Sequence, residues 1–418
     1  MGFENTTFYI IPVAIGNMRK YTDTLLSRGD WESDETICRP DYLLSYIHSL
    51  AHDPDRFRVL RYKKTAELPI HMFRDWVKYT VAPRIEEIYL CAFGTGVAFL
   101  EYRVAYGDMP LEEIKRFAYN FKKADNADHK GLLAEGEVSM MTATKQILYT
   151  DELGARPFFA YRNNIQYNCI CYHLIRLSKE QKKKEDIDRL CFYLKRSYND
   201  AYLYDKENDG SDYDMVYKPY SYMVWAGCQE GLVMITHETD HADTNSFLDK
   251  YYYDNLICDY HFMYLILLNQ RFSSLLHIEA LALAPDDSES LERINADATE
   301  LATRYAFHVV SDEMVYQNIY TNMYHIFHID KLLSDVEECR ARIKAVQKSI
   351  AERNEKRTSG LLAGLSWLTF FSALVDATGY VDRFTGHFAL ATALGSVGVA
   401  IVFTFFSVRN WVGGKKKK

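Results

Sequence analysis

The sequence lacks the short motifs that mark several common enzyme sites. It contains no G-x-x-x-x-G-K phosphate-binding loop and no G-x-S-x-G nucleophile motif. None of its eight cysteines forms a C-x-x-C pair, so we expect buried free thiols in a reducing compartment. The formal net charge of −8 indicates no broad basic surface for nucleic acid. The opening MGFENTTFYIIP has no basic segment before its short apolar run, so we expect no secretory signal.

Charged residues are also missing from two runs near the C-terminus. The first run, Thr358–Val381, has Asp376 as its only charge, and the second, Phe384–Val408, has no Asp, Glu, Lys or Arg. A membrane-spanning helix needs about 20 mostly apolar residues. The composition therefore predicts two C-terminal transmembrane helices.

Basic residues flank these two runs and predict their orientation. Arg353, Lys356 and Arg357 precede the first run, and Arg409 and the tail Lys415–Lys418 follow the second. Basic residues concentrate on the cytoplasmic side of membrane proteins. We therefore expect a multi-pass inner-membrane protein with both termini in the cytoplasm.

The N-terminal part reads as a mixture of strands and helices. Alternating and β-branched residues predict strands, and glycine-containing turns between such runs predict hairpins. A run that has Pro110 in its first turn and apolar residues at helical spacing predicts a helix over Met109–Ala124. Ser178–Arg189 reads as a polar connector. The predicted strands are Phe8–Ala14, Phe57–Tyr62 and Ile165–Leu177, and the predicted hairpins are Ile88–Tyr106 and Tyr222–Thr236.

The pattern becomes helical from about Asp243 onward. A long helix is expected after Asp243, and a second follows the caps Asp286 and Asp287. No proline falls between Asp312 and Ser359, so a third helix could extend for ~70 Å. Its apolar residues follow a heptad pattern, which indicates a packing seam with other helices or with copies of the chain. These residues are Ile329, Leu332, Val336, Cys339, Ile343, Val346 and Ile350.

Together these patterns predict an α+β cytosolic domain, a long helical stalk and two C-terminal transmembrane helices. The expected boundaries are 1–240 for an α/β sensor domain, 241–359 for the stalk, 360–411 for the transmembrane part and 412–418 for a basic cytoplasmic tail.

Four polar residues follow one face of the first predicted span. Their spacing of 3, 3 and 4 places them on the same side of a helix. They could form hydrogen bonds between packed helices. Alternatively they line a pore in a ring of subunits, where the aspartate forms a carboxylate ring that favours cations. These residues are Ser366, Thr369, Ser372 and Asp376.

The layout as a whole resembles the CorA magnesium-channel superfamily. In that family an α/β domain and long helices lead into a pore-lining span, a short outer loop, a second span and a basic end. The resemblance implies a homo-oligomer, a pentamer, in the lipid bilayer. The family motif Gly-Met-Asn at the outer loop keeps only its glycine here. The corresponding filter positions are Gly379, Tyr380, Val381 and Asp382.

These departures are similar to a divergent CorA-like branch that accompanies type III CRISPR systems. Members of that branch are thought to be membrane effectors triggered by a nucleotide messenger such as an adenylylated S-adenosylmethionine (SAM-AMP). The resemblance thus implies a channel or effector in antiviral defence, gated by a small nucleotide on the cytosolic domain, without direct contact to nucleic acid. A divalent cation (magnesium) transporter is the alternative.

A second alternative is suggested by the sequence His237-Glu238-Thr239-Asp240-His241, which matches the zinc-peptidase pattern H-E-x-x-H. Zinc binding needs both histidines on one helical turn. The preceding GLVMIT reads as a strand and the following ADTNSF as a helix start. The motif is therefore expected to lie at a strand-to-helix joint, as a polar linker or a ligand contact.

Ligand contacts in the α/β domain are expected at four polar residues if that domain binds a nucleotide; otherwise they lie on solvated faces. Gly94-Thr95-Gly96 is interpreted as a turn, because a strand and not a helix follows it. We expect no catalytic residue, no metal and no cofactor, apart from a nucleotide ligand or a divalent cation. The candidate contacts are Arg103, Arg162, Asn163 and Asn164.

Overall fold

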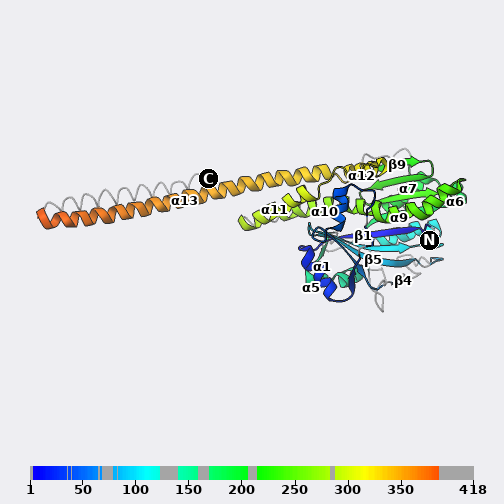
Figure 1. Cartoon of the computed structure of the whole chain (residues 1–418), viewed down its shortest axis with the longest axis horizontal. Coiled ribbons are helices and arrows are strands. Elements are labelled where there is room, and N and C mark those ends of the chain that lie inside the picture. Colours follow the sequence, from blue (N-terminus) through cyan, green and yellow to red (C-terminus); the bar gives the residue numbers. More distant parts are fainter. Residues whose placement is uncertain are drawn as a thin grey trace. The chain divides into compact units, whose positions relative to one another are not determined.

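The computed structural model divides the chain into two compact units. The first is Met1–Ala341 and the second is Arg342–Lys418. The structure describes residues 3–34, 36–38, 40–64, 66–67, 79–81, 83–122, 140–158, 169–205, 214–282 and 288–385. The first unit contains a β-sheet with helices on both of its faces (Figure 1).

The described strands form one mixed sheet of eleven strands, with the order β2-β3-β5-β6-β1-β8-β11-β10-β9. In addition, β4 pairs with β5 and β7 pairs with β1. Strands β8 and β11 run parallel, and the other described pairs are antiparallel. The strands are β1 (Thr6–Ala14), β2 (Trp31–Ser33), β3 (Phe57–Tyr62), β4 (Ala66–Glu67), β5 (Arg84–Phe93), β6 (Val97–Ala105), β7 (Arg156–Pro157), β8 (Ile170–Leu177), β9 (Met215–Tyr220), β10 (Met223–Cys228) and β11 (Gly231–His237).

Both faces of the sheet are buried, which explains the long apolar runs of its central strands. Along β1, Phe8 and Ile10 belong to the core on one face, whereas Tyr9 and Ile11 belong to the core on the other. This alternation follows from the two-residue period of a strand. The two predicted hairpins are confirmed as β5–β6 and β10–β11.

Six short helices and one longer one surround the strands of the N-terminal part. The predicted helix at Met109–Ala124 is confirmed as α3, with its apolar residues on the sheet. All eight cysteines are free and six are buried, as expected. The helices are α1 (Met18–Ser27), α2 (Ser45–His52), α3 (Leu111–Lys122), α4 (Met140–Leu148), α5 (Thr150–Leu153), α6 (Lys179–Lys184) and α7 (Ile187–Arg196).

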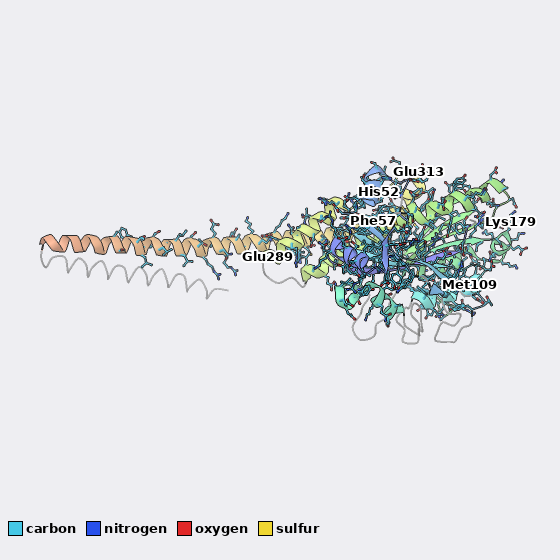
Figure 2. All side chains as sticks on the ribbon, turned by 60° about the horizontal axis from the view of Figure 1, so that its bottom comes forward. His52, Phe57, Met109, Lys179, Glu289 and Glu313 are labelled. Atoms are coloured by element: carbon cyan, nitrogen blue, oxygen red, sulfur yellow. The ribbon has the colours of Figure 1, made fainter. Side chains whose placement is uncertain are left out.

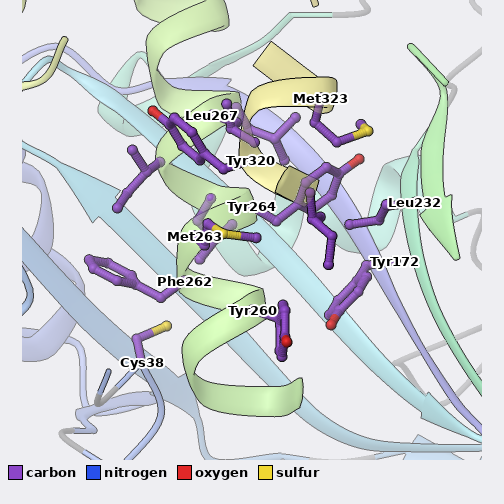
Figure 3. Packing of buried hydrophobic residues seen from close by; sticks show 14 of the residues in the cluster. Cys38, Tyr172, Leu232, Tyr260, Phe262, Met263, Tyr264, Leu267, Tyr320 and Met323 are labelled. Atoms are coloured by element: carbon purple, nitrogen blue, oxygen red, sulfur yellow. The ribbon is translucent and has the colours of Figure 1, made fainter. Parts of the chain in front are cut away.

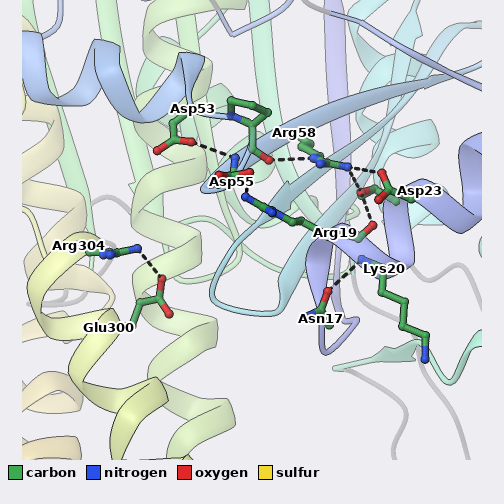
Figure 4. Close-up of polar contacts among 11 residues, drawn as sticks. Asn17, Arg19, Lys20, Asp23, Asp53, Asp55, Arg58, Glu300 and Arg304 are labelled. Carbon is green, nitrogen blue, oxygen red and sulfur yellow. Dashed lines mark hydrogen bonds and ion pairs between the residues drawn. The ribbon is translucent and has the colours of Figure 1, made fainter.

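The polar side of α1 is tied to the turn before β3. Asn17 caps the helix by accepting a hydrogen bond from the backbone N–H of Lys20 at 2.9 Å. Arg58 on β3 donates to Asp23 of α1 at 2.6 Å, and Arg19 forms an ion pair with Asp55 (Figure 4). These exposed pairs orient α1 and contribute little to stability individually.

The segment Ser178–Arg189 is not a connector, and that prediction was wrong. Ser178 and Gln181 form a capping box at the start of α6, and Asp186 caps α7. Both signals are present in the sequence as S-x-x-Q and an N-cap aspartate. These short helices carry many charged residues on their exposed side, and for that reason the segment was interpreted as a connector.

A helical layer covers one face of the sheet from Ala242 onward. Its central helix α10 is buried along Phe262–Leu268, where it contacts the sheet and α12 (Figure 3). Two π-helical turns precede it, and such turns are frequent at functional sites. The elements are α8 (Ala242–Phe247), η1 (Leu248–Tyr252), α9 (Tyr253–Asn255), η2 (Leu256–Tyr260), α10 (His261–Ala282), α11 (Ser288–Arg304) and α12 (Met314–Ile326).

The predicted third helix is broken in two at His328. Helix α12 ends at Ile326, His328 adopts a left-handed φ of 53°, and α13 (Ile329–Thr385) follows. Within the first unit, α13 packs against α11, where Arg340 donates to Thr299 at 2.8 Å. Beyond the end of that unit, α13 continues without interruption through the predicted stalk and into the predicted first span.

The prediction of two transmembrane helices requires correction. Among the described residues, no helix is both long and apolar enough to cross a membrane. In the described part of α13, Gly360, Gly364, Ser366 and Thr369 alternate with leucine and dilute its hydropathy. The charged stalk residues immediately before Thr358 also prevent a longer apolar stretch.

The predicted localisation is corrected for the same reason. A multi-pass inner-membrane protein with both termini in the cytoplasm required two spans, and the described helices provide none. Residues 386–408 of the second apolar run and the tail Lys415–Lys418 lie outside the described residues.

Candidate ligand-binding site

A pocket of about 270 Å³ lies at the outer edge of the sheet, around the β9–β10 hairpin. Strand β9 is the last strand of the sheet on this side. The pocket walls come from this hairpin, from the end of β11 and from α6 and α7. The lining residues are Lys182, Ile187, Lys218, Pro219, Tyr220, Ser221, Tyr222, Met223, Val224, Ile235 and His237.

Hydrogen bonds between the hairpin turn and β11 fix the pocket's shape. The carbonyl of Tyr222 accepts from the backbone N–H of His237 at 3.1 Å and from the Thr236 hydroxyl at 2.9 Å. The pairing of β9 with β10 shifts register between Met223 and Trp225. Such a bulge bends the hairpin locally and re-aims the side chains beside it.

Two lysines bring positive charge to the pocket. Lys218 on β9 pairs with Asp188 of α7 at 2.9 Å, which holds its ammonium in place. Lys182 on α6 is half-buried, and it forms no ion pair with another described residue. Lys182 therefore offers an ammonium group for an anionic ligand.

The imidazole of His237 is held by backbone carbonyls at the pocket rim. Its Nδ1 lies 2.9 Å from the carbonyl oxygen of Glu238, and its Nε2 lies 3.2 Å from that of Ser221. A carbonyl oxygen only accepts, so the imidazole acts as a hydrogen-bond donor at this rim.

Two tyrosines form an aromatic surface at the same hairpin. The rings of Tyr220 and Tyr222 stack at 5.4 Å with an angle of 8° between their planes. Tyr220 is 46% exposed, whereas Tyr222 is half-buried, and burial raises the pKa of the Tyr222 hydroxyl. An exposed tyrosine supported by a second ring is a suitable platform for a planar ligand.

Apolar residues form the floor of the pocket. Met223, Val224 and Ile235 are buried, and they belong to the sheet cores. A pocket with an apolar floor and a few convergent polar groups is typical of small-molecule sites. Cations beside an exposed aromatic ring suit a ligand with both a phosphate and a planar base.

The HETDH motif lies at this site, at the strand-to-helix joint that the sequence predicted. His237 ends β11, and His241 is the N-cap residue of α8. Asp240 pairs at 2.9 Å with Lys179, the first residue of α6. Figure 2 labels Lys179. Within the described residues, no group of three His, Cys, Asp or Glu side chains could hold a metal ion. The motif therefore lacks the helical arrangement that a zinc peptidase needs.

Of the four predicted ligand contacts, Arg103 lies in the described part of the chain, and it does not line this pocket. Arg103 on β6 is 17% exposed and pairs with Glu87 at 2.7 Å and Glu86 at 3.5 Å. Burial lowers the pKa of its guanidinium, but Tyr253 and these two carboxylates raise it, and the net shift is upward. Arg103 is thus engaged within the sheet, and Arg162, Asn163 and Asn164 lie outside the described residues.

The predicted pore residues lie on α13. Ser366, Thr369 and Ser372 are exposed, and the Thr369 hydroxyl donates to the carbonyl of Leu365 at 3.0 Å. Asp376 and the filter positions Gly379, Tyr380, Val381 and Asp382 continue the same helix, and their side chains lie outside the described part.

Sequence reasoning missed the residues that matter most here. Lys182 and Tyr220 gave no signal, because a lysine-rich helix and an exposed tyrosine are common on surfaces. Two further residues, Glu101 and His261, did give a signal in the sequence. Glu101 is an acidic residue within the apolar strand β6, and His261 begins an apolar helix. Both are fully buried.

Comparison with known proteins gives little further support. No known protein family matches the sequence, and no curated protein matches it. One solved structure that matches is the CorA magnesium transporter from Methanocaldococcus jannaschii, with 10% identity and a TM-score of 0.18. The match covers 63% of this chain and 95% of the transporter. This similarity is weak.

Proposed function

We propose that this protein is a nucleotide-responsive protein, in which the β9–β10 pocket binds the ligand and α13 joins copies of the chain. The observation that carries the proposal is the combination in one pocket of Lys182, whose ammonium forms no ion pair with another described residue, and Tyr220, whose exposed ring is stacked. Phosphate recognition by a cation and base stacking on an aromatic ring are the two contacts that a nucleotide offers.

The ligand class is a small nucleotide with an exposed base and at least one phosphate. The adenylylated S-adenosylmethionine implied by the family resemblance belongs to this class, as does ATP. A role in antiviral defence beside a type III CRISPR system is part of the proposal. Neighbouring CRISPR genes would support that role.

Self-association through α13 is supported by its exposed apolar side chains. Leu361, Leu365 and Leu368 are 70%, 59% and 67% exposed. A helix that exposes such residues gains stability by packing against another helix. A second copy of the chain supplies the same exposed apolar residues, so two copies can cover them on each other. Five copies is the number implied by the resemblance.

Ion transport is not proposed, because the predicted channel depended on transmembrane helices. Peptidase activity is not proposed either, since the HETDH residues are separated between a strand end and a helix cap. We propose a binding function without catalysis.

Titration calorimetry on the full chain tests the pocket with ATP and with SAM-AMP as probes. We expect Tyr220→Ala to weaken binding by ~5- to 150-fold, because base stacking contributes about 1–3 kcal/mol. Lys182→Ala should weaken binding by ~10-fold and reduce the salt dependence, because it removes one phosphate contact.

Lys184→Ala is the matched control, because Lys184 is an exposed lysine on the same helix that does not line the pocket. It should bind like the wild type. Equal losses in Lys182→Ala and Lys184→Ala would indicate a diffuse charge effect. Binding of neither probe by the folded wild type would refute the nucleotide proposal.

A further inference from the structure

Two cysteines, a histidine and a glutamate meet between the sheet and α10. Cys38 lies in the loop between β2 and α2, Cys91 on β5, Glu101 on β6, and His261 at the start of α10. Their exposed fractions are 2%, 0%, 0% and 0%. Figure 3 shows Cys38 beside the first turns of α10. Four reactive or ionisable groups are therefore enclosed in an otherwise apolar core.

The histidine connects the carboxylate to one thiol. His261 Nε2 lies 2.9 Å from Glu101 Oε2, and His261 Nδ1 lies 4.0 Å from Cys38 Sγ. The imidazole ring stacks on Phe8 at 4.5 Å and on Tyr172 at 5.9 Å. These rings fix its orientation, so that its two nitrogens face the carboxylate and the thiol.

Among the described residues, His261 is the ion-pair partner of the Glu101 carboxylate. Neither of its oxygens has a well-directed hydrogen bond within the described part of the chain. A buried carboxylate without donors depends on a nearby cation. The histidine at 2.9 Å supplies that cation when it is protonated.

The surrounding groups shift the pKa values of the two thiols in opposite directions. Burial raises the pKa of Cys38, but contacts with the Cys91 thiol and with His261 outweigh this effect and lower it below the usual thiol value. Burial lowers the pKa of His261, but Glu101 and Cys38 raise it to about 10. Burial, and then Cys38, raise the pKa of Cys91 well above its usual value.

We propose that Cys38 is a peroxide-reactive cysteine and that Cys91 is its resolving partner in an intramolecular disulfide. The arrangement supplies each group that this chemistry needs: a nucleophilic sulfur, an adjacent proton donor and a second thiol in contact with the first. The inference is independent of the nucleotide pocket.

The reaction takes two balanced steps with a hydroperoxide as oxidant. In the first, the Cys38 thiolate attacks one peroxide oxygen, the O–O bond breaks, and the leaving hydroxide takes the His261 proton to form water. This step leaves Cys38 as a sulfenic acid. In the second, the Cys91 sulfur attacks Cys38 Sγ, the S–O bond breaks, and hydroxide leaves with the Cys91 proton as a second water. The two thiols supply the two electrons that reduce the peroxide.

Hydrogen peroxide is the appropriate oxidant for a buried site, because it is close to water in size. It reaches the core through local opening, which larger oxidants do not. The same burial protects the thiolate from bulky thiol reagents.

Peptide mass spectrometry of the intact chain after hydrogen peroxide treatment and alkylation tests this proposal without a variant. We expect a linked Cys38–Cys91 peptide as the first product, formed at least ~10-fold faster than oxidation at Cys258 or Cys339. Those two cysteines are the more exposed ones. Oxidation that begins at Cys258 or Cys339 while Cys38 stays reduced would overturn the proposal.

Variants separate the two roles. Cys91→Ser should stop the reaction at a Cys38 sulfenic acid, which dimedone captures once the treated chain is unfolded in its presence, and Cys38→Ser should leave Cys91 reduced. Cys339→Ser is the matched control and should form the linked peptide at the wild-type rate. A disulfide between Cys38 and any other cysteine in the wild type would exclude Cys91 as the resolving partner.

Discussion

At the scale of single residues, Glu101 and His261 are the most consequential pair. Both are fully buried, so removing one charge leaves the other without compensation. We expect Glu101→Gln to lower the free energy of unfolding by about 3–5 kcal/mol near neutral pH. Urea denaturation measures the difference. A loss below about 1 kcal/mol would show that the pair carries little charge.

The same pair predicts a pH dependence. Burial lowers the pKa of His261, but Glu101 and Cys38 raise it from 6.5 to about 10 in the folded protein. Because this pKa is higher in the folded protein, protonation of His261 stabilises the fold. The stabilisation is complete below the unfolded pKa of 6.5, and it is lost as the pH rises through the folded pKa of about 10. The stability gap between wild type and Glu101→Gln should therefore narrow as the pH is raised toward 10. A constant gap would contradict the assignment.

Position 96 requires glycine for two reasons: its backbone φ is positive, and there is no space for a Cβ atom. Gly96 has φ +81°, and a Cβ there would lie 2.7 Å from the carbonyl oxygen of Gly16. Gly107 also has a positive φ, but it has open space around it. We expect Gly107→Ala to cost about 1–2 kcal/mol and Gly96→Ala roughly twice as much, measured by thermal unfolding. Equal costs would mean that the neighbouring turn moves aside.

At the scale of elements, α13 changes its surroundings along its length. Val336 is 2% exposed within the first unit, whereas Val346, in the second unit, is 44% exposed. Both positions belong to the heptad pattern. The same apolar seam therefore serves the fold at one end and is available for association beyond it.

Aspartate at each of these positions distinguishes the two roles. Val336→Asp should destabilise the first unit by about 3 kcal/mol, because it buries an unpaired charge. Val346→Asp should leave the unfolding midpoint of that unit unchanged and weaken self-association, as measured by sedimentation. If Val346→Asp leaves association intact, the seam is not the interface.

At the scale of the whole molecule, the pocket proposed to bind a nucleotide lies in the first unit, and the apolar residues of α13 proposed for association lie in the second. A chain that ends at Ala341 keeps the complete sheet and both cores. We expect it to fold, to bind the nucleotide probes with wild-type affinity and to sediment as a monomer. Persistent oligomers of the shortened chain would place the interface in the first unit.

Local features of the fold could be predicted from the sequence alone. The hairpins β5–β6 and β10–β11 and helix α3 were predicted, because each depends on neighbouring residues. The prediction of transmembrane helices was wrong, because no described helix is both long and apolar enough to cross a membrane. The break between α12 and α13 at His328 could not be predicted, because no proline or glycine lies there.

Contacts between distant parts of the chain were decided only by the tertiary structure. The parallel pairing of β8 with β11 and the approach of Glu101 to His261 join segments that share no local pattern. Lys182, Tyr220 and His237 line one pocket for the same reason. Periodicity in a sequence identifies which face of an element is apolar. Which second element packs on that apolar face depends on packing over the whole core. This packing brings Glu101 and His261 together.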